Sequence, residues 1–307
     1  MDSSPHLDAR ALVYVSVAML TWSSAYATIS YSLSAFTHGE VALARLSLGL
    51  ICFLAWLRAR KVALPPLRAW PPLLGLGVMG LTLYHLCLNY AETEVASGTA
   101  AIILALSPAV TGVASTLWLG ERLSPRTIAG LCLAMTGVVL VVLTSGQSLS
   151  FQPKAALVLI SVVATSLYFV GQKPFLLRYS AIAVTTVTFI GGTVAAIPFG
   201  LHLPQALMAA APSRIAALAW LGLAPTFVGY LTWNLAIQRA SVSKVTSFIY
   251  FSTPIALLIS WLWLCERPGA LTLMGAVIVI AGVLLANSRA RANPAVLSDQ
   301  RRPSTIE

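Results

Sequence analysis

The feature that most constrains the fold is a succession of ten apolar runs, each about as long as a helix that crosses a membrane. The runs cover approximately residues 11–31, 38–57, 70–88, 96–118, 127–144, 154–172, 181–201, 213–235, 243–264 and 270–287. A helix needs about 20 mainly apolar residues to cross the hydrocarbon core of a bilayer. The runs therefore predict ten transmembrane helices, and the short connections between them leave no room for a further domain.

The composition supports this class of protein. Of 307 residues, 58% are hydrophobic and 9% are charged, whereas a soluble domain has about 25% charged residues. Lipid offers the backbone no hydrogen-bond partner, so the prediction is an all-α polytopic membrane protein. The net charge of +10 does not indicate nucleic-acid binding, because the basic residues lie between the apolar runs and not along one helix face. Four cysteines without metal-ligand spacing predict neither a metal site nor a cofactor.

The distribution of basic residues predicts the orientation. If the N-terminus lies inside the cell, the inner segments hold fifteen of the nineteen Lys and Arg residues, the outer segments hold three, and Arg45 lies within the second run. Because inner loops carry the excess of positive charge, both termini are expected in the cytoplasm. The first ten residues resemble no cleavable leader, so the first run is expected to persist as an anchor.

An internal repeat divides the chain. The stretch STLWLGER at 115–122 recurs as SWLWLCER at 260–267, with six of eight positions identical. At the same offset of 145 residues lie the pairs Asn89/Asn234, Gly130/Gly275 and Gly137/Gly282, and with a slip of one residue Pro108/Pro254. The prediction is two five-helix repeats, 1–150 and 151–288, followed by a cytoplasmic tail at 289–307. Since five is odd, the second repeat crosses the membrane inverted, as in many secondary transporters whose substrate site lies at the repeat interface.

These features resemble a known superfamily. The ten runs, the P-x12-E-R and P-x11-E-R ends of the fourth and ninth runs and the paired glycines resemble the drug/metabolite transporter superfamily. Within it the chain is similar to the EamA group, and most of all to the YddG-type aromatic amino acid exporters. The resemblance covers about residues 10–290. It implies a basket of ten helices in a bacterial inner membrane, around a central cavity that opens to each side of the membrane in turn. No short motif in the chain specifies a substrate.

Polar side chains at helical spacing indicate which runs surround that cavity, because a polar stripe must face protein or water. They predict a cavity lined by runs one, three, four, six, eight and nine, with the fifth and tenth runs outside and held together through glycines. The candidate cavity residues are Trp22, Tyr26, Tyr84, His85, Asn89, Tyr168, Gln172, Tyr230, Trp233, Asn234 and Tyr250. Each also has a purely structural interpretation: a buried ring in the core, or an asparagine that caps or joins helices.

Prolines and charges add three expectations. Pro108 and Pro254 lie within runs, where each removes a helix hydrogen bond, so both are predicted to kink their helices and are candidate hinges. Arg45 is expected to pair with Glu40 or to extend toward the lipid headgroups. His85 is the titratable group well inside a run, and its role is open between an interior hydrogen bond, substrate contact and proton coupling.

A neutral cavity rich in aromatic rings favours a small neutral or zwitterionic substrate with a flat apolar body, such as an aromatic amino acid. Because no Asp or Glu lies deep in a run, facilitated diffusion by a monomeric exporter is predicted. The alternative is a proton-coupled drug or metabolite antiporter that exports aromatic cations. An enzyme is not predicted, because no nucleophile–base set is present, and a channel is disfavoured because no charged ring or filter sequence occurs.

Overall fold

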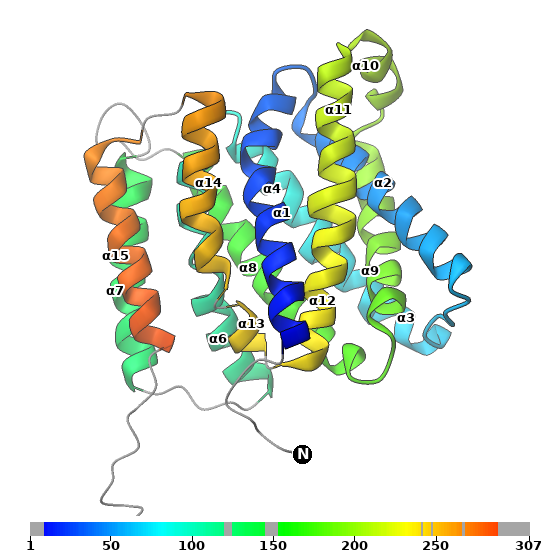
Figure 1. Cartoon of the computed structure of the whole chain (residues 1–307), viewed down its shortest axis with the longest axis horizontal. Coiled ribbons are helices and arrows are strands. Elements are labelled where there is room, and N and C mark those ends of the chain that lie inside the picture. The colour runs from blue at the N-terminus through cyan, green and yellow to red at the C-terminus, as the bar shows by residue number, and fades with distance from the viewer. Residues whose placement is uncertain are drawn as a thin grey trace, which may run out of the picture.

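The computed structural model describes residues 9–119, 125–144, 153–240, 242–246, 248–265 and 268–287, and the regular elements in these ranges are all helical (Figure 1). The first five spans consist of α1 (Ala9–Leu33), α2 (His38–Ala59), a third span from η1 (Leu67–Ala69) through α3 (Trp70–Gly77), η2 (Val78–Leu83) and α4 (Tyr84–Ala91), a fourth from α5 (Ser97–Leu104) and α6 (Ser107–Leu119), and α7 (Pro125–Thr144).

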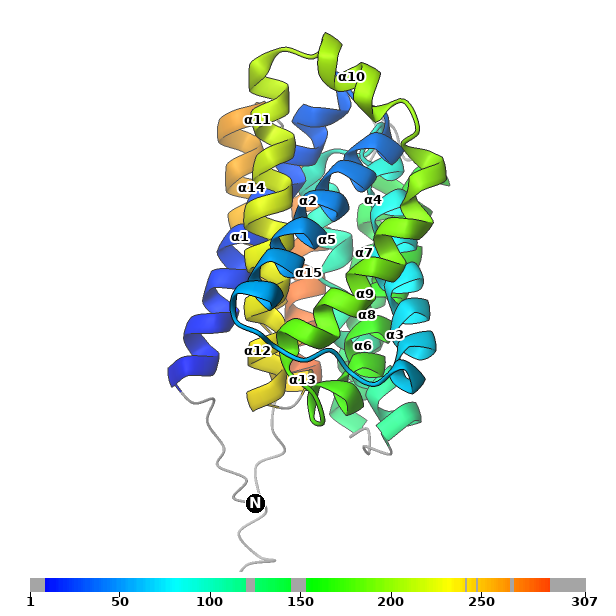
Figure 2. The ribbon, with the colours of Figure 1, turned by 90° about the vertical axis from the view of Figure 1, so that its right-hand side faces the viewer.

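The second five spans repeat this order. They consist of α8 (Pro153–Leu176), α9 (Ala181–Ala196) with η3 (Ile197–Phe199), an eighth span from α11 (Pro212–Leu221) through η4 (Gly222–Gly229) and α12 (Tyr230–Arg239), a ninth from α13 (Val242–Thr246) and α14 (Ile249–Leu264), and α15 (Ala270–Asn287). A further short helix, α10 (Leu203–Ala209), lies across one end of the bundle beside α11 (Figure 2).

Length and composition of these helices agree with the sequence prediction. Among the described residues, seven helical stretches are long and apolar enough to cross a membrane, and shorter apolar helices occur at Ile128–Gly137, Ile255–Leu264 and Ala270–Gly282, in the fifth, ninth and tenth spans. The prediction of an all-α, ten-span membrane protein is confirmed.

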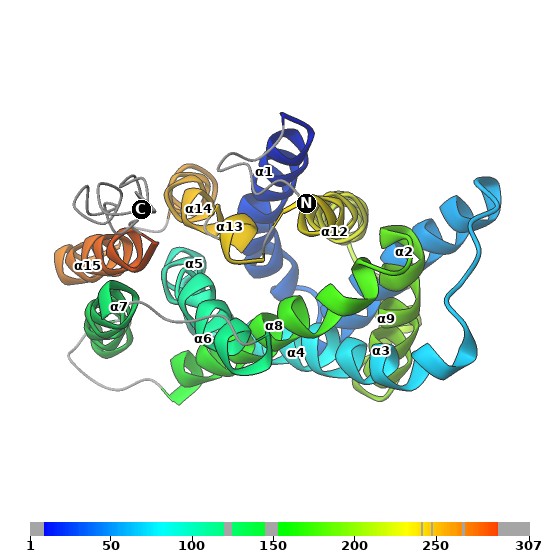
Figure 3. The same cartoon turned by 90° about the horizontal axis from the view of Figure 1, so that it is seen from below.

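The inverted relation of the two halves is visible in one helix pair. α7 and α15 lie together at one edge of the molecule (Figures 1 and 3). A Cβ atom added to Gly137 would lie 2.8 Å from the carbonyl oxygen of Gly275, and one added to Gly282 would lie 2.7 Å from that of Gly130. The two contacts are equivalent under the repeat, because Gly137 corresponds to Gly282 and Gly275 corresponds to Gly130. Such reciprocal contacts arise when two equivalent surfaces meet about a twofold axis, which is the arrangement that an inverted repeat predicts.

The halves are interleaved and do not form separate lobes. α1 packs against α12, α14 and η4, while α4 packs against α8 and α2 packs against α9 and η4. Ala9, where α1 begins, and Asn287, where α15 ends, lie at the same end of the bundle (Figure 1). That end is the lower one in the figure.

The third and eighth spans are not continuous α-helices. Each contains a π-helical segment, η2 and η4, and the offset of 145 residues places Val78 of η2 on Leu223 of η4. π-Helical turns widen the helix and leave backbone groups for other partners, and they occur often at functional sites. The sequence analysis treated both spans as regular helices, because nothing in residue spacing distinguishes a π turn from an α turn.

The two candidate hinge prolines differ in their surroundings. The fourth span is interrupted between Leu104 and Ser107, and Pro108 lies in the first turn of α6, where the missing N–H has no helical partner to lose. Pro254 lies within α14, which is continuous from Ile249. The corresponding interruption in the ninth span comes earlier, between α13 and α14. A break at Pro108 is therefore observed, while the hinge function of both prolines stays a prediction.

Candidate functional site: a cavity between the halves

A cavity lies among helices of both halves, and its volume of about 40 Å³ is room for a few water molecules. The first half contributes side chains from α1, α2, α4, α5 and α6, and the second half contributes them from α8, α12 and α14. The lining comprises Trp22, Ala25, Tyr26, Ile29, Arg45, Tyr84, His85, Leu88, Leu104, Ser107, Thr165, Phe169, Tyr230, Ile249 and Ser252. The second span thus takes part, which the polar stripes did not indicate.

Five of the predicted residues line this cavity, namely Trp22, Tyr26, Tyr84, His85 and Tyr230. The rings of Tyr84 and His85 meet edge to face at 4.6 Å, and His85 faces Tyr230 at 6.4 Å between centroids. The phenol hydroxyls of Tyr26, Tyr84 and Tyr230 make no hydrogen bond within the described part of the chain. They are available to a bound molecule as donors and acceptors.

An aromatic cluster begins at the cavity lining and extends to Trp233 of α12. The ring centroid of Trp22 lies 4.8 Å from that of Trp233 and 6.1 Å from that of Phe169, with which it is stacked. The indole Nε1 of Trp22 donates to the carbonyl oxygen of Pro225 at 2.8 Å, within the π-helical segment η4. Gly229 leaves space for this indole, because an added Cβ would lie 2.5 Å from Nε1.

The other predicted residues are buried but lie outside this lining. Gln172 Nε2 donates to Asn234 Oδ1 at 2.9 Å, and Asn234 Nδ2 donates to Thr185 Oγ1 at 2.6 Å. This chain of amides joins α8, α12 and α9.

The remaining residues of that group also join elements. Asn89 Nδ2 donates to the carbonyl oxygen of His38 at 3.1 Å, and the hydroxyl of Tyr168 pairs with that of Thr188 at 3.3 Å. Trp233 and Tyr250 are buried in the core. Substrate contact by these residues in another conformation stays a prediction.

Arg45 lies elsewhere than the sequence predicted. It does not pair with Glu40, because Glu40 closes a capping box with Thr37 at the start of α2. Instead Arg45 is 3% exposed, lines the cavity, and donates from Nε to Thr226 Oγ1 at 3.1 Å. A lone arginine inside an apolar run was the available signal, since such a charge is costly unless it faces a cavity.

His85 is the second polar group buried at the cavity. It is 1% exposed, and neither Nδ1 nor Nε2 has a hydrogen-bond partner among the described residues. Buried polar atoms are usually hydrogen-bonded, so an imidazole without a partner at a cavity is a candidate group for binding a ligand. Among the described residues, no group of three or more His, Cys, Asp and Glu side chains is placed to hold a metal ion.

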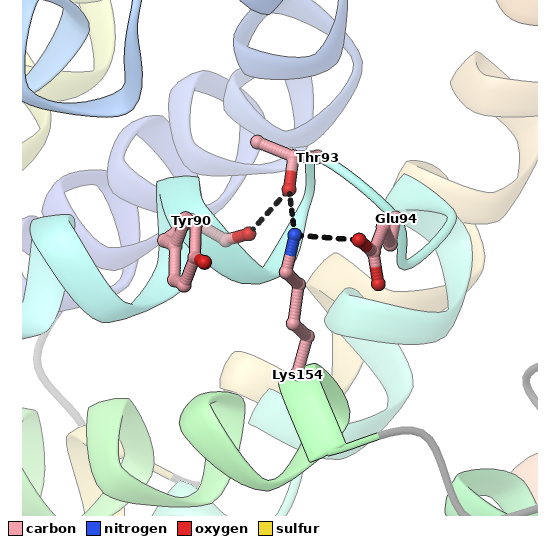
Figure 4. A network of polar contacts seen from close by, with 4 residues as sticks. All are labelled: Tyr90, Thr93, Glu94 and Lys154. Carbon is pink, nitrogen blue, oxygen red and sulfur yellow. Dashed lines mark hydrogen bonds and ion pairs between the residues drawn. The ribbon is translucent and has the colours of Figure 1, made fainter.

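A polar network joins the halves at the upper end of the bundle (Figure 4). Lys154, at the start of α8, donates to Thr93 Oγ1 at 3.0 Å and forms an ion pair with Glu94 at 2.6 Å, both in the connection after α4. Its ammonium also lies 4.4 Å from the ring centroid of Tyr90. Thr93 in turn donates to the carbonyl oxygen of Tyr90 at 2.8 Å.

The chain is similar to known exporters. It is 30% identical over 283 residues to a probable terminal-alkyne amino-acid exporter of Streptantibioticus cattleyicolor, covering 91% of this chain and 94% of that protein. It is 27% identical over 272 residues to the pseudopaline exporter CntI of Pseudomonas aeruginosa, covering 87% and 92%. A solved crystal structure shares the fold, with a TM-score of 0.66 at 21% identity over 90% of this chain and 96% of that one.

Comparison with family models shows both the family and the internal duplication. The pattern of the EamA-like transporter family matches this chain twice, over residues 9–143 and again over residues 152–288. The two matches coincide with the two sets of five spans that enclose the cavity. With two inverted repeats, a cavity between them and both copies of the family pattern, this chain belongs to the EamA-like transporter family of the drug/metabolite transporter superfamily.

Proposed function

We propose that this transporter exports small neutral or zwitterionic metabolites, aromatic amino acids among them, by alternating access. The observation that carries the proposal is the cavity itself, which lies between inverted halves and is lined by Trp22, Tyr26, Tyr84, Phe169 and Tyr230. Aromatic faces pack against flat apolar groups and attract ammonium groups. An amino acid with an aromatic side chain offers both.

The relatives support export of amino-acid-like compounds. One similar protein is named a probable terminal-alkyne amino-acid exporter and another a pseudopaline exporter. These names describe the substrates of the two relatives. At sequence identities of 30% and 27%, the compound that this chain transports has to be identified by experiment.

The contracted cavity fits an alternating mechanism. A volume of about 40 Å³ is too small for a whole amino acid, so the halves must move apart before a substrate enters. We infer that the aromatic cluster of Trp22, Phe169 and Trp233 closes one side of the cavity. The Lys154–Glu94 pair joins the halves at another place, between the connection after α4 and the start of α8. Release of one closure at a time would give access from one side at a time.

We also place the lower end of Figure 1 in the cytoplasm of a bacterial inner membrane. Arg10, Lys173, Arg178 and Arg239 lie at that end, where α1 begins and α8 and α12 finish. An excess of Lys and Arg marks the cytoplasmic side. A membrane-impermeant thiol reagent added outside intact cells should label Ser213→Cys at the start of α11 and not Arg178→Cys at the end of α8. The reverse labelling would overturn this orientation.

Transport in reconstituted vesicles tests the function. Radiolabelled Phe, Trp and Tyr should equilibrate across vesicles that contain the protein, and Thr, Met and a cationic aromatic dye serve as comparisons. Because the lining of the described cavity contains no carboxylate, an imposed pH difference should not drive accumulation. Accumulation of the dye against its gradient would favour the proton-coupled antiporter instead, with His85 as the candidate titrating group.

A further inference from the structure

Arg45 is the charged side chain of the cavity lining. Its single hydrogen bond within the described part of the chain leaves from Nε and goes to Thr226 in the π-helical segment η4. The two terminal nitrogens of the guanidinium bond to no described residue, although Arg45 is only 3% exposed. The strongest donors in the cavity are therefore unused by the protein.

The groups around Arg45 do not neutralise it at close range. Tyr26, Tyr84 and Tyr230 lie near enough to act on its charge, and so does Glu92 at the C-terminal end of α4. Glu92 is itself buried but does not line the cavity. The charge that faces the cavity is therefore that of the Arg45 guanidinium.

A second donor faces the same space. His85 lines the cavity, lies within electrostatic range of Arg45, and has no hydrogen-bond partner on either ring nitrogen. An imidazole in any protonation state has an N–H to donate. The terminal nitrogens of a buried guanidinium and the N–H of a buried imidazole in the same cavity lining are complementary to a group with two acceptor oxygens.

We propose that Arg45 binds the carboxylate of the transported molecule, and that this contact restricts the substrates to carboxylate-bearing compounds. The inference rests on the export function proposed above and specifies its substrate class. The planar guanidinium matches the two oxygens of a carboxylate. Once the cavity has opened to admit an amino acid, a carboxylate bound at Arg45 and His85 would leave the side chain of that amino acid to the rings of the same lining, Trp22, Phe169 and Tyr230. A purely cationic aromatic compound is repelled by the same guanidinium.

Three probes of one shape separate the contributions of the two charged groups. L-Phenylalanine has both, 2-phenylethylamine lacks the carboxylate, and 3-phenylpropanoate lacks the ammonium. For the purified wild-type protein in detergent, we expect phenylalanine and 3-phenylpropanoate to bind, and 2-phenylethylamine to bind at least about tenfold more weakly. In Arg45→Gln we expect phenylalanine to lose about tenfold in affinity and 2-phenylethylamine to lose nothing. Arg45→Lys should recover part of the loss, since it keeps the charge but not the planar pair of donors.

Two control variants separate recognition from structure. Arg178→Gln removes an exposed arginine at the end of α8 and should leave all three affinities unchanged. Thr226→Val removes the acceptor of the Arg45 Nε hydrogen bond and keeps the guanidinium. If Arg45 only joins α2 to η4, Thr226→Val and Arg45→Gln will lower thermal stability alike, and both will weaken all probes equally. That result overturns the proposal.

The same measurements distinguish this inference from the function on which it rests. Wild-type protein that neither binds nor transports any of the three probes contradicts the proposed function. If the wild-type protein and Arg45→Gln transport phenylalanine equally well, the proposed function stands and the role of Arg45 is refuted. Loss of phenylalanine transport with 2-phenylethylamine binding retained supports both.

Discussion

Individual side chains at the cavity combine two properties that protein interiors normally avoid together, burial and unsatisfied polarity. His85 is the clearest case, because both ring nitrogens lack a partner among the described residues. Leaving a buried polar group unsatisfied costs about 1–3 kcal/mol. A protein keeps such a group where activity needs it, at the expense of stability.

His85→Leu is therefore expected to change stability and activity in opposite directions. The leucine fills similar space without an orphaned polar atom, so the melting temperature in detergent should rise by a few degrees. Vesicle uptake of phenylalanine should fall at least about tenfold. Leu88→Met, a volume-conserving change in the same lining, is the control and should alter neither quantity much. Unchanged uptake by His85→Leu would show that the imidazole has only a structural role.

At the scale of helices, glycines determine how closely elements approach. α7 and α15 meet where a Cβ on Gly137 would lie 2.7 Å from the backbone nitrogen of Val279. Without a hydrophobic driving force between helices in lipid, such close backbone packing is a main source of helix association. Gly282 makes the equivalent close contact with α7, so the two helices pack closely at two positions related by the pseudo-twofold axis.

Gly137→Ala should separate these two helices and destabilise the protein by about 1–3 kcal/mol. Gly112→Ala, in α6, is the matched control, because an added Cβ there meets nothing within 4 Å. It should be neutral or stabilising, since alanine favours helix over glycine by up to about 1 kcal/mol. Thermal unfolding in detergent measures both. Equal melting temperatures for the two variants would contradict close packing at Gly137.

The interruption of the fourth span provides an element that can bend. Pro108 follows the break between Leu104 and Ser107, next to the cavity residues of α5 and α6. Pro108→Ala combined with Pro254→Ala should allow more continuous helices and slow vesicle uptake several-fold, while substrate affinity stays the same. Each single variant should have a smaller effect. An unchanged uptake rate in the double variant would exclude hinge function for these prolines.

At the scale of the whole molecule, the Lys154–Glu94 pair is one of the contacts that join the two halves. The Lys154–Glu94 pair is a partly exposed ion pair, with side-chain exposures of 21% and 57%, and such pairs contribute less than about 1 kcal/mol. The pair can therefore break in each transport cycle. Its value is positional, because it joins the connection after α4 in one half to α8 in the other (Figure 4).

A covalent link at this position should stop transport. In a background without the four native cysteines, Glu94→Cys with Lys154→Cys should be joined by a short thiol cross-linker, and uptake should be lost and then recovered after cleavage of the linker. Lys154→Ala alone should transport nearly as well as the wild type, because the ion pair is weak. Full activity of the cross-linked protein would mean that this end does not open.

The sequence by itself determined that this is a membrane protein, that it has ten spans and that it is duplicated. Lipid leaves few alternatives to apolar helices, and the repeat is visible as identical residues at a constant offset. It also identified Trp22, Tyr26, Tyr84, His85 and Tyr230, whose rings interrupt apolar helices at helical spacing. Only the tertiary structure decided that Arg45 enters the cavity, since Glu40 is engaged in a helix cap and Thr226 comes from the other half. The π-helical turns, too, are known only from the tertiary structure, because the spacing of residues along the sequence does not distinguish a π turn from an α turn.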